Sequence, residues 1–157
     1  MRFEFWSVGR GHELYVKAGV EDFTSRITNY FPLEWRILDS KKTGSNISPE
    51  KIKEQESAVI LSSLKPEDYL VALDERGKSL TSPKLADFIA DRANERVKRL
   101  IFLIGGAYGL DEKVLSRAKF SWSLSSLTFP HQLVRLILAE QVYRACTIMR
   151  NEKYHHG

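Results

Sequence analysis

The sequence contains very little cysteine and has no long uninterrupted apolar run. Its single cysteine, Cys146, cannot form a disulfide within the chain, which is typical of proteins in a reducing cytoplasm. No apolar run is long enough to cross a bilayer, so the sequence predicts no membrane span. An acidic residue, Glu4, also interrupts the segment where a secretory signal would need a continuous apolar region. We therefore expect a cytoplasmic protein.

The sequence also lacks the usual motifs for binding metals and phosphates. No group of His, Cys, Asp and Glu residues has the spacing of metal ligands, so we expect no metal. Residues 105–109 read Gly-Gly-x-x-Gly, which is not the dinucleotide fingerprint because the first two glycines are adjacent. Residues 72–79 have the spacing of a phosphate-binding loop, but Asp74 and Glu75 would place carboxylates where amides must face the phosphate.

Length and charge set broad limits on the fold and the partner. The chain has 157 residues, of which 43% are hydrophobic and 28% charged, as expected for one domain with one core. A formal net charge of +4 permits a nucleic-acid partner without requiring one. The residues that could contact phosphates, or could equally be solvated surface, are Lys41, Lys42, Arg92, Arg96, Lys98 and Arg99.

Hydrophobic patterning predicts strands that alternate with helices. Residues 69–73 and 100–104 are continuously apolar, which is typical of strands buried on both faces. Further strands are predicted at 2–8, 33–38 and 120–124, and helices at 16–30, 49–64, 82–93, 110–117 and from 130 onward. This alternation predicts a single-domain α/β fold with a parallel sheet that spans residues 1–157.

Two predicted loops follow strands, at the edge of the sheet where open α/β folds bind their ligands. The first is the glycine turn after 100–104, which by itself could be a plain tight turn. The second, residues 124–129, carries three hydroxyls that could simply cap the final helix. On that helix, Glu140 and Arg144 stand four residues apart and could form a surface ion pair.

Short motifs in the last third of the chain carry a family resemblance. They are Ile104-Gly105-Gly106 with Gly109, Ser121-Trp122-Ser123-Leu124-Ser125, Pro130-His131 with Leu133-Val134-Arg135, Glu140-Gln141 with Tyr143-Arg144, and Tyr154-His155. Together they resemble the signature of the bacterial 23S rRNA pseudouridine N3-methyltransferases, small members of the trefoil-knotted SPOUT superfamily. Chain length and element order agree with this family from end to end.

The resemblance implies a C-terminal trefoil knot whose turns form a pocket for S-adenosylmethionine. The donor-binding residues that it implies are Leu73, Gly105, Leu124, Ser125, Ser126, Leu127, Thr128 and Phe129. Backbone amides and carbonyls of this loop would hold the adenine and the amino-acid part of the donor. The sulfonium of the donor is positive, which explains why the sequence carries no phosphate motif. The resemblance also implies a homodimer, with contacts made by the final helix.

The implied reaction is methylation at N3 of a pseudouridine in helix 69 of 23S rRNA, in the assembled ribosome. The implied catalytic residues are Arg144, Tyr154 and His155. Arg144 could stabilise negative charge on the carbonyl oxygens beside N3. His155 could accept the N3 proton, and Tyr154 could stack on the base or orient it. We expect the tail to fray unless something holds it, and to order over the bound base beside the partner subunit's donor.

Two alternatives remain at this stage. The first keeps the fold and changes the target, as in knotted methyltransferases that act on the ribose 2′-O of tRNA; the short Tyr154-His155 tail argues against it. The second is a non-catalytic α/β module that binds a nucleotide or RNA. Transfer of a labelled methyl group to ribosomes from cells that lack the protein separates all three.

Overall fold

The computed structural model describes residues 1–39 and 46–157, which form a single α/β domain. Five strands and five helices alternate within these residues, in the order β1 (Arg2–Val8), α1 (Leu14–Ile27), β2 (Leu33–Leu38), α2 (Pro49–Ser63), β3 (Tyr69–Ser79), α3 (Ser82–Asn94), β4 (Arg99–Ile104), α4 (Glu112–Arg117), β5 (Phe120–Ser123) and α5 (His131–Met149). The strands form one sheet in the order β2-β1-β4-β3-β5, and every neighbouring pair is parallel. The predicted parallel α/β sheet is therefore confirmed.

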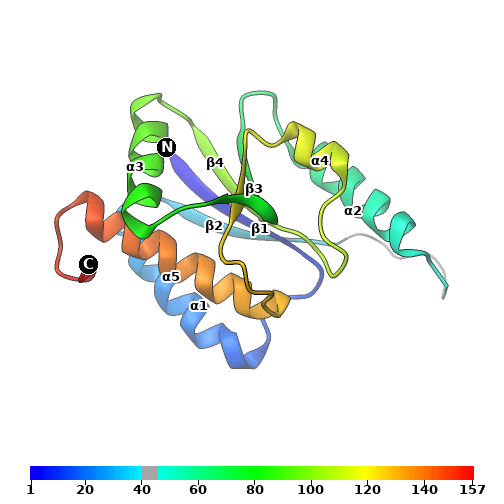
Figure 1. The fold of residues 1–157 in the computed structure, drawn as a ribbon, viewed down its shortest axis with the longest axis horizontal. Helices are drawn as coiled ribbons and strands as arrows, with labels where there is room; N and C mark the ends of the chain where they lie inside the picture. Colours follow the sequence, from blue (N-terminus) through cyan, green and yellow to red (C-terminus); the bar gives the residue numbers. More distant parts are fainter. Residues whose placement is uncertain (40–45) are drawn as a thin grey trace.

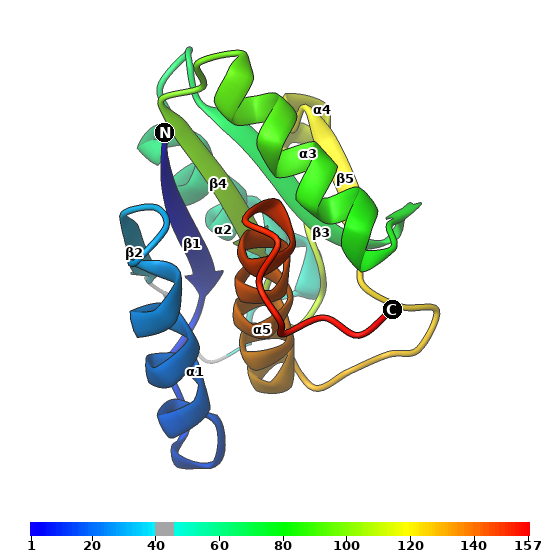
Figure 2. The same ribbon diagram turned by 90° about the vertical axis from the view of Figure 1, so that its left-hand side faces the viewer.

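Helices cover both faces of the sheet and make three layers (Figures 1 and 2). Because strand side chains alternate between the faces, Leu100 and Phe102 of β4 pack with α3 and α5, while Ile101 and Leu103 pack with α2 and α4. All six residues of β4 are buried, as predicted for a strand covered on both sides. Helix α1 lies beside α5 on the first face, and the added Cβ of Gly19 would come within 2.6 Å of Leu136.

Helix starts follow the capping chemistry that the sequence contains. The Ser48 hydroxyl accepts a hydrogen bond from the Lys51 amide at 3.3 Å and Pro49 follows it, which confirms the predicted start of α2. At α3 the capping side chain is Thr81, one residue before the predicted start, and it accepts from the Lys84 amide at 3.3 Å.

Strand β3 is longer than the sequence suggests. We predicted a turn at residues 74–79, but β3 continues to Ser79 along β5. The pairing is irregular, since Leu73 and Lys78 both align with Trp122 and the residues between them form a bulge. Gly77 permits this approach, because an added Cβ would lie 2.6 Å from the Ser121 backbone.

Arg99, one of the candidate phosphate contacts, lies inside the protein. Its Nε donates to Asp68 Oδ1 at 2.7 Å, and its Nη1 lies 3.2 Å from Glu4 Oε1. Burial of all three residues makes this a structural ion cluster, so the interpretation of Arg99 as a surface contact was wrong. Within the described residues, no helix is long and apolar enough to span a membrane.

Candidate functional site

The donor-binding residues implied by the resemblance come together at one edge of the sheet. Leu73 of β3 pairs with Ile104 of β4 on one side and with Trp122 of β5 on the other. Gly105 directly follows Ile104, and the loop 124–129 directly follows β5. The part of β3 before its bulge and the carboxyl ends of β4 and β5 therefore bring Leu73, Gly105 and Leu124 to the same edge, where ligands of open α/β sheets bind.

The glycine turn after β4 is tightly packed. An added Cβ on Gly105 would lie 2.9 Å from the Leu110 side chain and 3.2 Å from the Gly109 carbonyl carbon. Gly109 has a φ of 81°, and its amide donates to the Gly106 carbonyl at 3.1 Å. The turn therefore folds back over Gly105, and glycine is needed there for the packing of the protein itself.

Among the described residues, the backbone of the loop 124–129 is hydrogen-bonded only to side-chain hydroxyls. Within the part of the chain that the structure describes, none of its residues takes part in a backbone–backbone hydrogen bond. The Leu127 amide donates to the Ser125 hydroxyl at 3.0 Å, and the Ser123 hydroxyl donates to the Ser125 carbonyl at 3.1 Å. These hydroxyls brace the loop and do not cap α5, whose N-cap residue is Pro130 without a side-chain cap.

The three predicted catalytic residues form one cluster, in which Arg144 and Tyr154 share the Glu140 carboxylate and His155 contacts Arg144. Arg144 donates to Glu140 Oε1 from Nε at 3.1 Å and from Nη2 at 2.5 Å, and the Tyr154 hydroxyl donates to the same oxygen at 3.0 Å. Arg144 Nη1 lies 3.3 Å from His155 Nδ1, and its guanidinium sits 4.7 Å from the centre of the Tyr154 ring. The structure therefore brings together Arg144, Tyr154 and His155 around Glu140.

Other contacts hold the tail against the body of the protein. The Tyr30 hydroxyl donates to Glu152 Oε2 at 2.6 Å, and the Tyr143 and Tyr154 rings pack edge to face at 4.7 Å. Burial and the bond to Glu152 raise the pKa of Tyr30 to about 12. Burial and the bond to Glu140 also raise the pKa of Tyr154, so its phenol is neutral at physiological pH.

Two groups of predicted site residues lie apart within one chain: the predicted donor edge (Leu73, Gly105 and residues 124–129) and the tail cluster (Glu140, Arg144, Tyr154 and His155). The loop 124–129 enters α5 at His131, whereas Arg144 and the tail lie at the other end of this helix (Figure 1). At the rise of an α-helix, His131 and Arg144 are roughly 20 Å apart. The two parts of the predicted site are therefore separated by most of the length of α5.

The other candidate phosphate contacts differ in accessibility. Arg96 and Lys98 are exposed, whereas the Arg92 guanidinium lies 4.9 Å from the Tyr69 ring centre and pairs with Glu95 at 2.9 Å. Lys41 and Lys42 lie outside the described residues. Among the described residues, no group of three or more His, Cys, Asp or Glu side chains could hold a metal ion.

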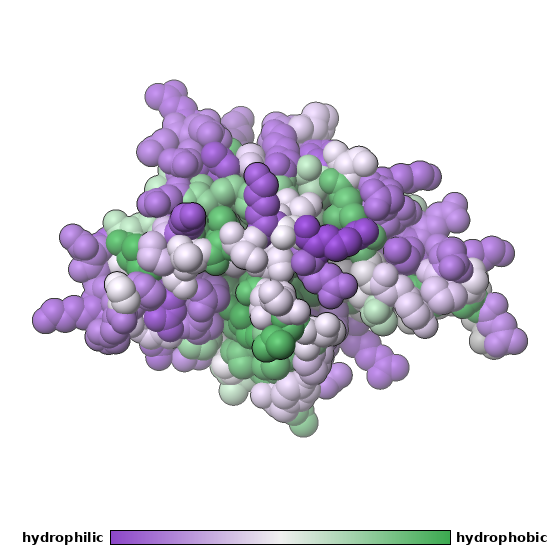
Figure 3. Space-filling model, viewed as in Figure 1, coloured by the Kyte–Doolittle hydropathy of each residue, from purple (hydrophilic) through white to green (hydrophobic). Residues whose placement is uncertain are grey.

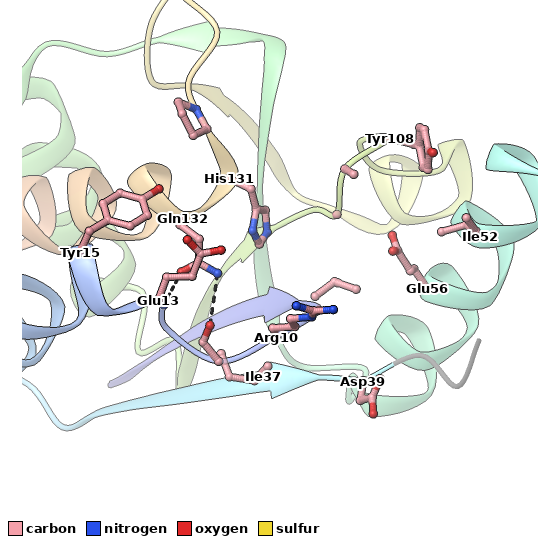
Figure 4. Close-up of a pocket in the computed structure, with 16 residues that line it drawn as sticks. Arg10, Glu13, Tyr15, Ile37, Asp39, Ile52, Glu56, Tyr108, His131 and Gln132 are labelled. Atoms are coloured by element: carbon pink, nitrogen blue, oxygen red, sulfur yellow. Dashed lines mark hydrogen bonds between the residues drawn. The ribbon is translucent and has the colours of Figure 1, made fainter. Parts of the chain in front are cut away.

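A cavity of about 1110 Å³ opens beside the glycine turn, and sequence reasoning missed it. It is formed by the ends of β1 and β2, the starts of α1 and α5, and residues of α2 (Figure 4). His131 lines it and lies 3.3 Å from the Ser7 hydroxyl. Burial lowers the pKa of His131, and the nearby Arg135 cation lowers it further. The sequence contained one signal for this cavity, the Gly9-Arg10-Gly11 break after the first strand, and these three residues line it.

A parallel α/β sheet with loops gathered at one edge of β3, β4 and β5 is an architecture that many unrelated proteins share, and the sequence places the chain more narrowly. Residues 1–155 match the family model described as predicted SPOUT methyltransferase. The chain therefore belongs to the SPOUT methyltransferase family.

Relatives extend over the whole chain. It is 39% identical over 156 residues to the ribosomal RNA large subunit methyltransferase H of Cytophaga hutchinsonii, which covers 99% of this chain and 100% of that protein. It is 41% identical over 149 residues to the protein of the same name from Parabacteroides distasonis, which covers 95% of each chain. A solved structure of a probable methylase family protein from Haemophilus influenzae aligns with a TM-score of 0.53 at 10% identity, covering 99% of this chain and 70% of that one, which shows the fold alone.

Proposed function

We propose that this protein transfers a methyl group from S-adenosylmethionine to N3 of a pseudouridine in helix 69 of 23S rRNA, in the assembled ribosome. The observation that carries the proposal is the full-length similarity to proteins named ribosomal RNA large subunit methyltransferase H, at about 40% identity. Ribosomal RNA is found in the cytoplasm, and the single cysteine of the chain also led us to expect a cytoplasmic protein. The assignment of the trefoil knot likewise rests on the family.

The residues at the donor edge fit the proposed methyl donor. Residues 124–129 offer backbone amides and carbonyls without backbone partners of their own, and they need no charged side chain to hold an adenine or an amino acid. Gly105 brings the backbone of the turn to the same edge, directly after β4. S-adenosylmethionine supplies an electrophilic methyl group on a positively charged sulfur. Backbone carbonyl oxygens can face this positive charge, whereas a phosphate-binding loop presents amides that suit an anion.

The tail cluster fits the target base. N3 of a pseudouridine carries a proton and lies between two carbonyl groups, so the protein must remove a proton and stabilise negative charge. In this proposal the guanidinium of Arg144 faces the carbonyl oxygens, and His155 takes the proton from N3. The neutral ring of Tyr154 stacks on the base and orients it. Glu140 in turn orients both Arg144 and Tyr154.

A homodimer would unite the two parts. If two copies pack α5 against α5 in opposite directions around a two-fold axis, the tail of one protomer reaches the donor edge of its partner. Apolar side chains suited to such an interface are exposed at the start of α1, where Leu14 is 89% exposed, and in the loop that leads into α5, where Leu127 is 69% exposed. Figure 3 shows apolar surface between hydrophilic regions over the part of this face where α1 and α5 lie.

The test is methyl transfer to ribosomes from cells that lack this protein. The purified protein should transfer labelled methyl groups from S-adenosylmethionine to 23S rRNA. The added methyl group should block reverse transcription at one loop position, because N3 belongs to the Watson–Crick edge. Transfer to tRNA instead would favour the ribose 2′-O alternative. Absence of transfer to either RNA, with the donor bound, would contradict the proposal.

A further inference from the structure

The cavity beside the glycine turn lies outside the proposed donor site. Strand β4 is the middle strand of the sheet, so its end divides the carboxyl edge into two halves. Leu73 and Leu124 belong to the half formed by β3 and β5, whereas the cavity belongs to the half formed by β1 and β2. His131 lies between the halves, because it begins α5 directly after the loop 124–129 and Pro130 and also lines the cavity.

The walls of the cavity combine an aromatic ring with both signs of charge. Figure 4 shows Tyr108 and Glu56 on one side, His131 and Gln132 on the opposite side, and Arg10 between them. The Tyr108 ring is 52% exposed. Among the described residues, the Arg10 guanidinium makes no hydrogen bond or ion pair. An aromatic face and an available guanidinium are the groups that stack on unpaired bases.

A buried cation fixes this part of the cavity. Arg135 is 0% exposed, and among the described residues it forms no ion pair with a carboxylate. Its Nη2 donates to the Arg10 carbonyl at 2.7 Å, and its Nη1 lies 3.2 Å from His12 Nδ1. These bonds fix the backbone of Arg10 at the cavity. Only the side chain of Arg10 therefore has to be ordered when a ligand binds.

The charges indicate a base and not a free phosphate. Three carboxylates, from Glu13, Asp39 and Glu56, line the same cavity and would repel an anion that entered it. A neutral base has both amino donors, from which carboxylates accept, and carbonyl acceptors, to which the Arg10 guanidinium can donate. A volume of about 1110 Å³ is more than sufficient for one base with part of its ribose.

We propose that this cavity binds an unpaired nucleobase of the RNA substrate that neighbours the methylated one, stacked on Tyr108 and contacted by Arg10. This inference rests on the proposed function and adds a second RNA contact to it. A small single-domain enzyme gains specificity in this way, because two bases of one loop must be unstacked and positioned together before transfer occurs.

The test compares Tyr108→Ala and Arg10→Ala with two matched controls. Tyr108→Phe keeps the ring, and Lys113→Ala removes one positive charge from an exposed site on α4 that does not line the cavity. Stacking of one base contributes about 1–3 kcal/mol, so Tyr108→Ala should weaken ribosome binding roughly 5- to 150-fold. Binding of S-adenosylmethionine by calorimetry should not change in any variant, and both controls should bind ribosomes as the unaltered protein does.

Ultraviolet cross-linking of the unaltered protein to ribosomes gives a direct readout. Mass spectrometry should find a nucleotide adduct on the peptide that contains Tyr108, at a position of 23S rRNA next to the methylated one. The inference is overturned if Tyr108→Ala and Arg10→Ala bind and methylate ribosomes normally, if either variant loses donor binding, or if the peptide cross-links only to ribosomal protein. Failure of the unaltered protein to methylate ribosomes would instead contradict the proposed function, and the cross-link would still report on the cavity.

Discussion

The hydroxyl of Tyr154 donates to Glu140 Oε1 at 3.0 Å, and the same oxygen accepts two hydrogen bonds from Arg144. One carboxylate on α5 thus joins a residue of the helix to a residue of the tail. Because a charged acceptor strengthens each of these bonds, Glu140 orders the tail before any RNA arrives.

Replacing Glu140 should therefore slow methyl transfer without affecting the donor. Glu140→Gln keeps the size of the side chain and loses its charge, so Arg144 and Tyr154 lose their common anchor. We expect kcat on ribosomes to fall about tenfold, equivalent to about 1.4 kcal/mol, with unchanged calorimetric binding of S-adenosylmethionine. Glu152→Gln, which alters only the bond from Tyr30, is the control. An unchanged kcat for Glu140→Gln would remove this residue from the site.

Removing the tail should separate folding from activity. Deletion of residues 154–157 removes Tyr154 and His155, both of which pack on the outer end of α5. We expect thermal unfolding, dimerisation and donor binding to change little, while methyl transfer falls by orders of magnitude. Arg144→Ala should behave in the same way. A truncated protein that methylates ribosomes at the full rate would show that the tail only covers the helix end.

Substitution at Gly105 tests the donor edge. Gly105→Val should abolish calorimetric binding of S-adenosylmethionine while the fold survives. Because an added Cβ at Gly105 also meets Leu110 at 2.9 Å, the packing effect needs its own control. Gly105→Ala combined with Leu110→Ala relieves that contact. If the double variant binds the donor normally, Gly105 matters only for packing. If binding stays weak while thermal unfolding is unchanged, the backbone at Gly105 faces the donor.

Mixing two inactive variants tests the shared site. A protomer with Gly105→Val keeps its tail, and a protomer that lacks residues 154–157 keeps its donor edge. If each site takes its donor edge from one chain and its tail from the other, mixed dimers contain one complete site and should regain activity. Light scattering should first establish a dimer at micromolar concentration. A mixture as inactive as its components, despite subunit exchange, would place both parts of the site in one chain.

High pH should weaken the attachment of the tail. The folded protein raises the pKa of Tyr30 to about 12, above the value of about 10 expected in an unfolded chain. The contribution of Tyr30 to stability is therefore complete below pH 10 and is lost as the pH rises from about 10 towards 12. The pKa of Tyr30 can be measured from phenol absorbance during a pH titration, as the difference between the unaltered protein and Tyr30→Phe. Titration of Tyr30 near pH 10 would contradict its hydrogen bond to Glu152.

The elements that the sequence predicted well are those with a clear local pattern. The apolar run at Leu100–Ile104 predicted a buried strand, and Ser48 with Pro49 predicted a helix start, because burial and capping act on neighbouring residues. The end of β3 was missed, because polar residues after Leu73 resemble a turn until β5 pairs with them. Strand pairing depends on residues far away in the sequence, which no local pattern contains.

The candidate site shows the same limit. Motifs placed Gly105 and the loop 124–129 after strands, and the resemblance assigned the tail, but neither predicted that Glu140 joins Arg144 to Tyr154. Glu140 and Arg144 matched an ordinary helical ion pair, and the third partner comes from beyond the helix. The cavity was missed for a related reason, since its residues come from five stretches of the sequence that only the folded chain brings together.

Helix α5 connects the loop 124–129 to the tail without a break, so it fixes the rotational phase between them as well as their distance. Each residue of an α-helix turns the chain by about 100°, and one full turn takes about 3.6 residues. Insertion of a single residue in the middle of α5 would rotate Arg144 and Glu140 to a different side of the helix relative to His131. The length of α5 is therefore constrained in whole turns, even where its exposed side chains are free to vary.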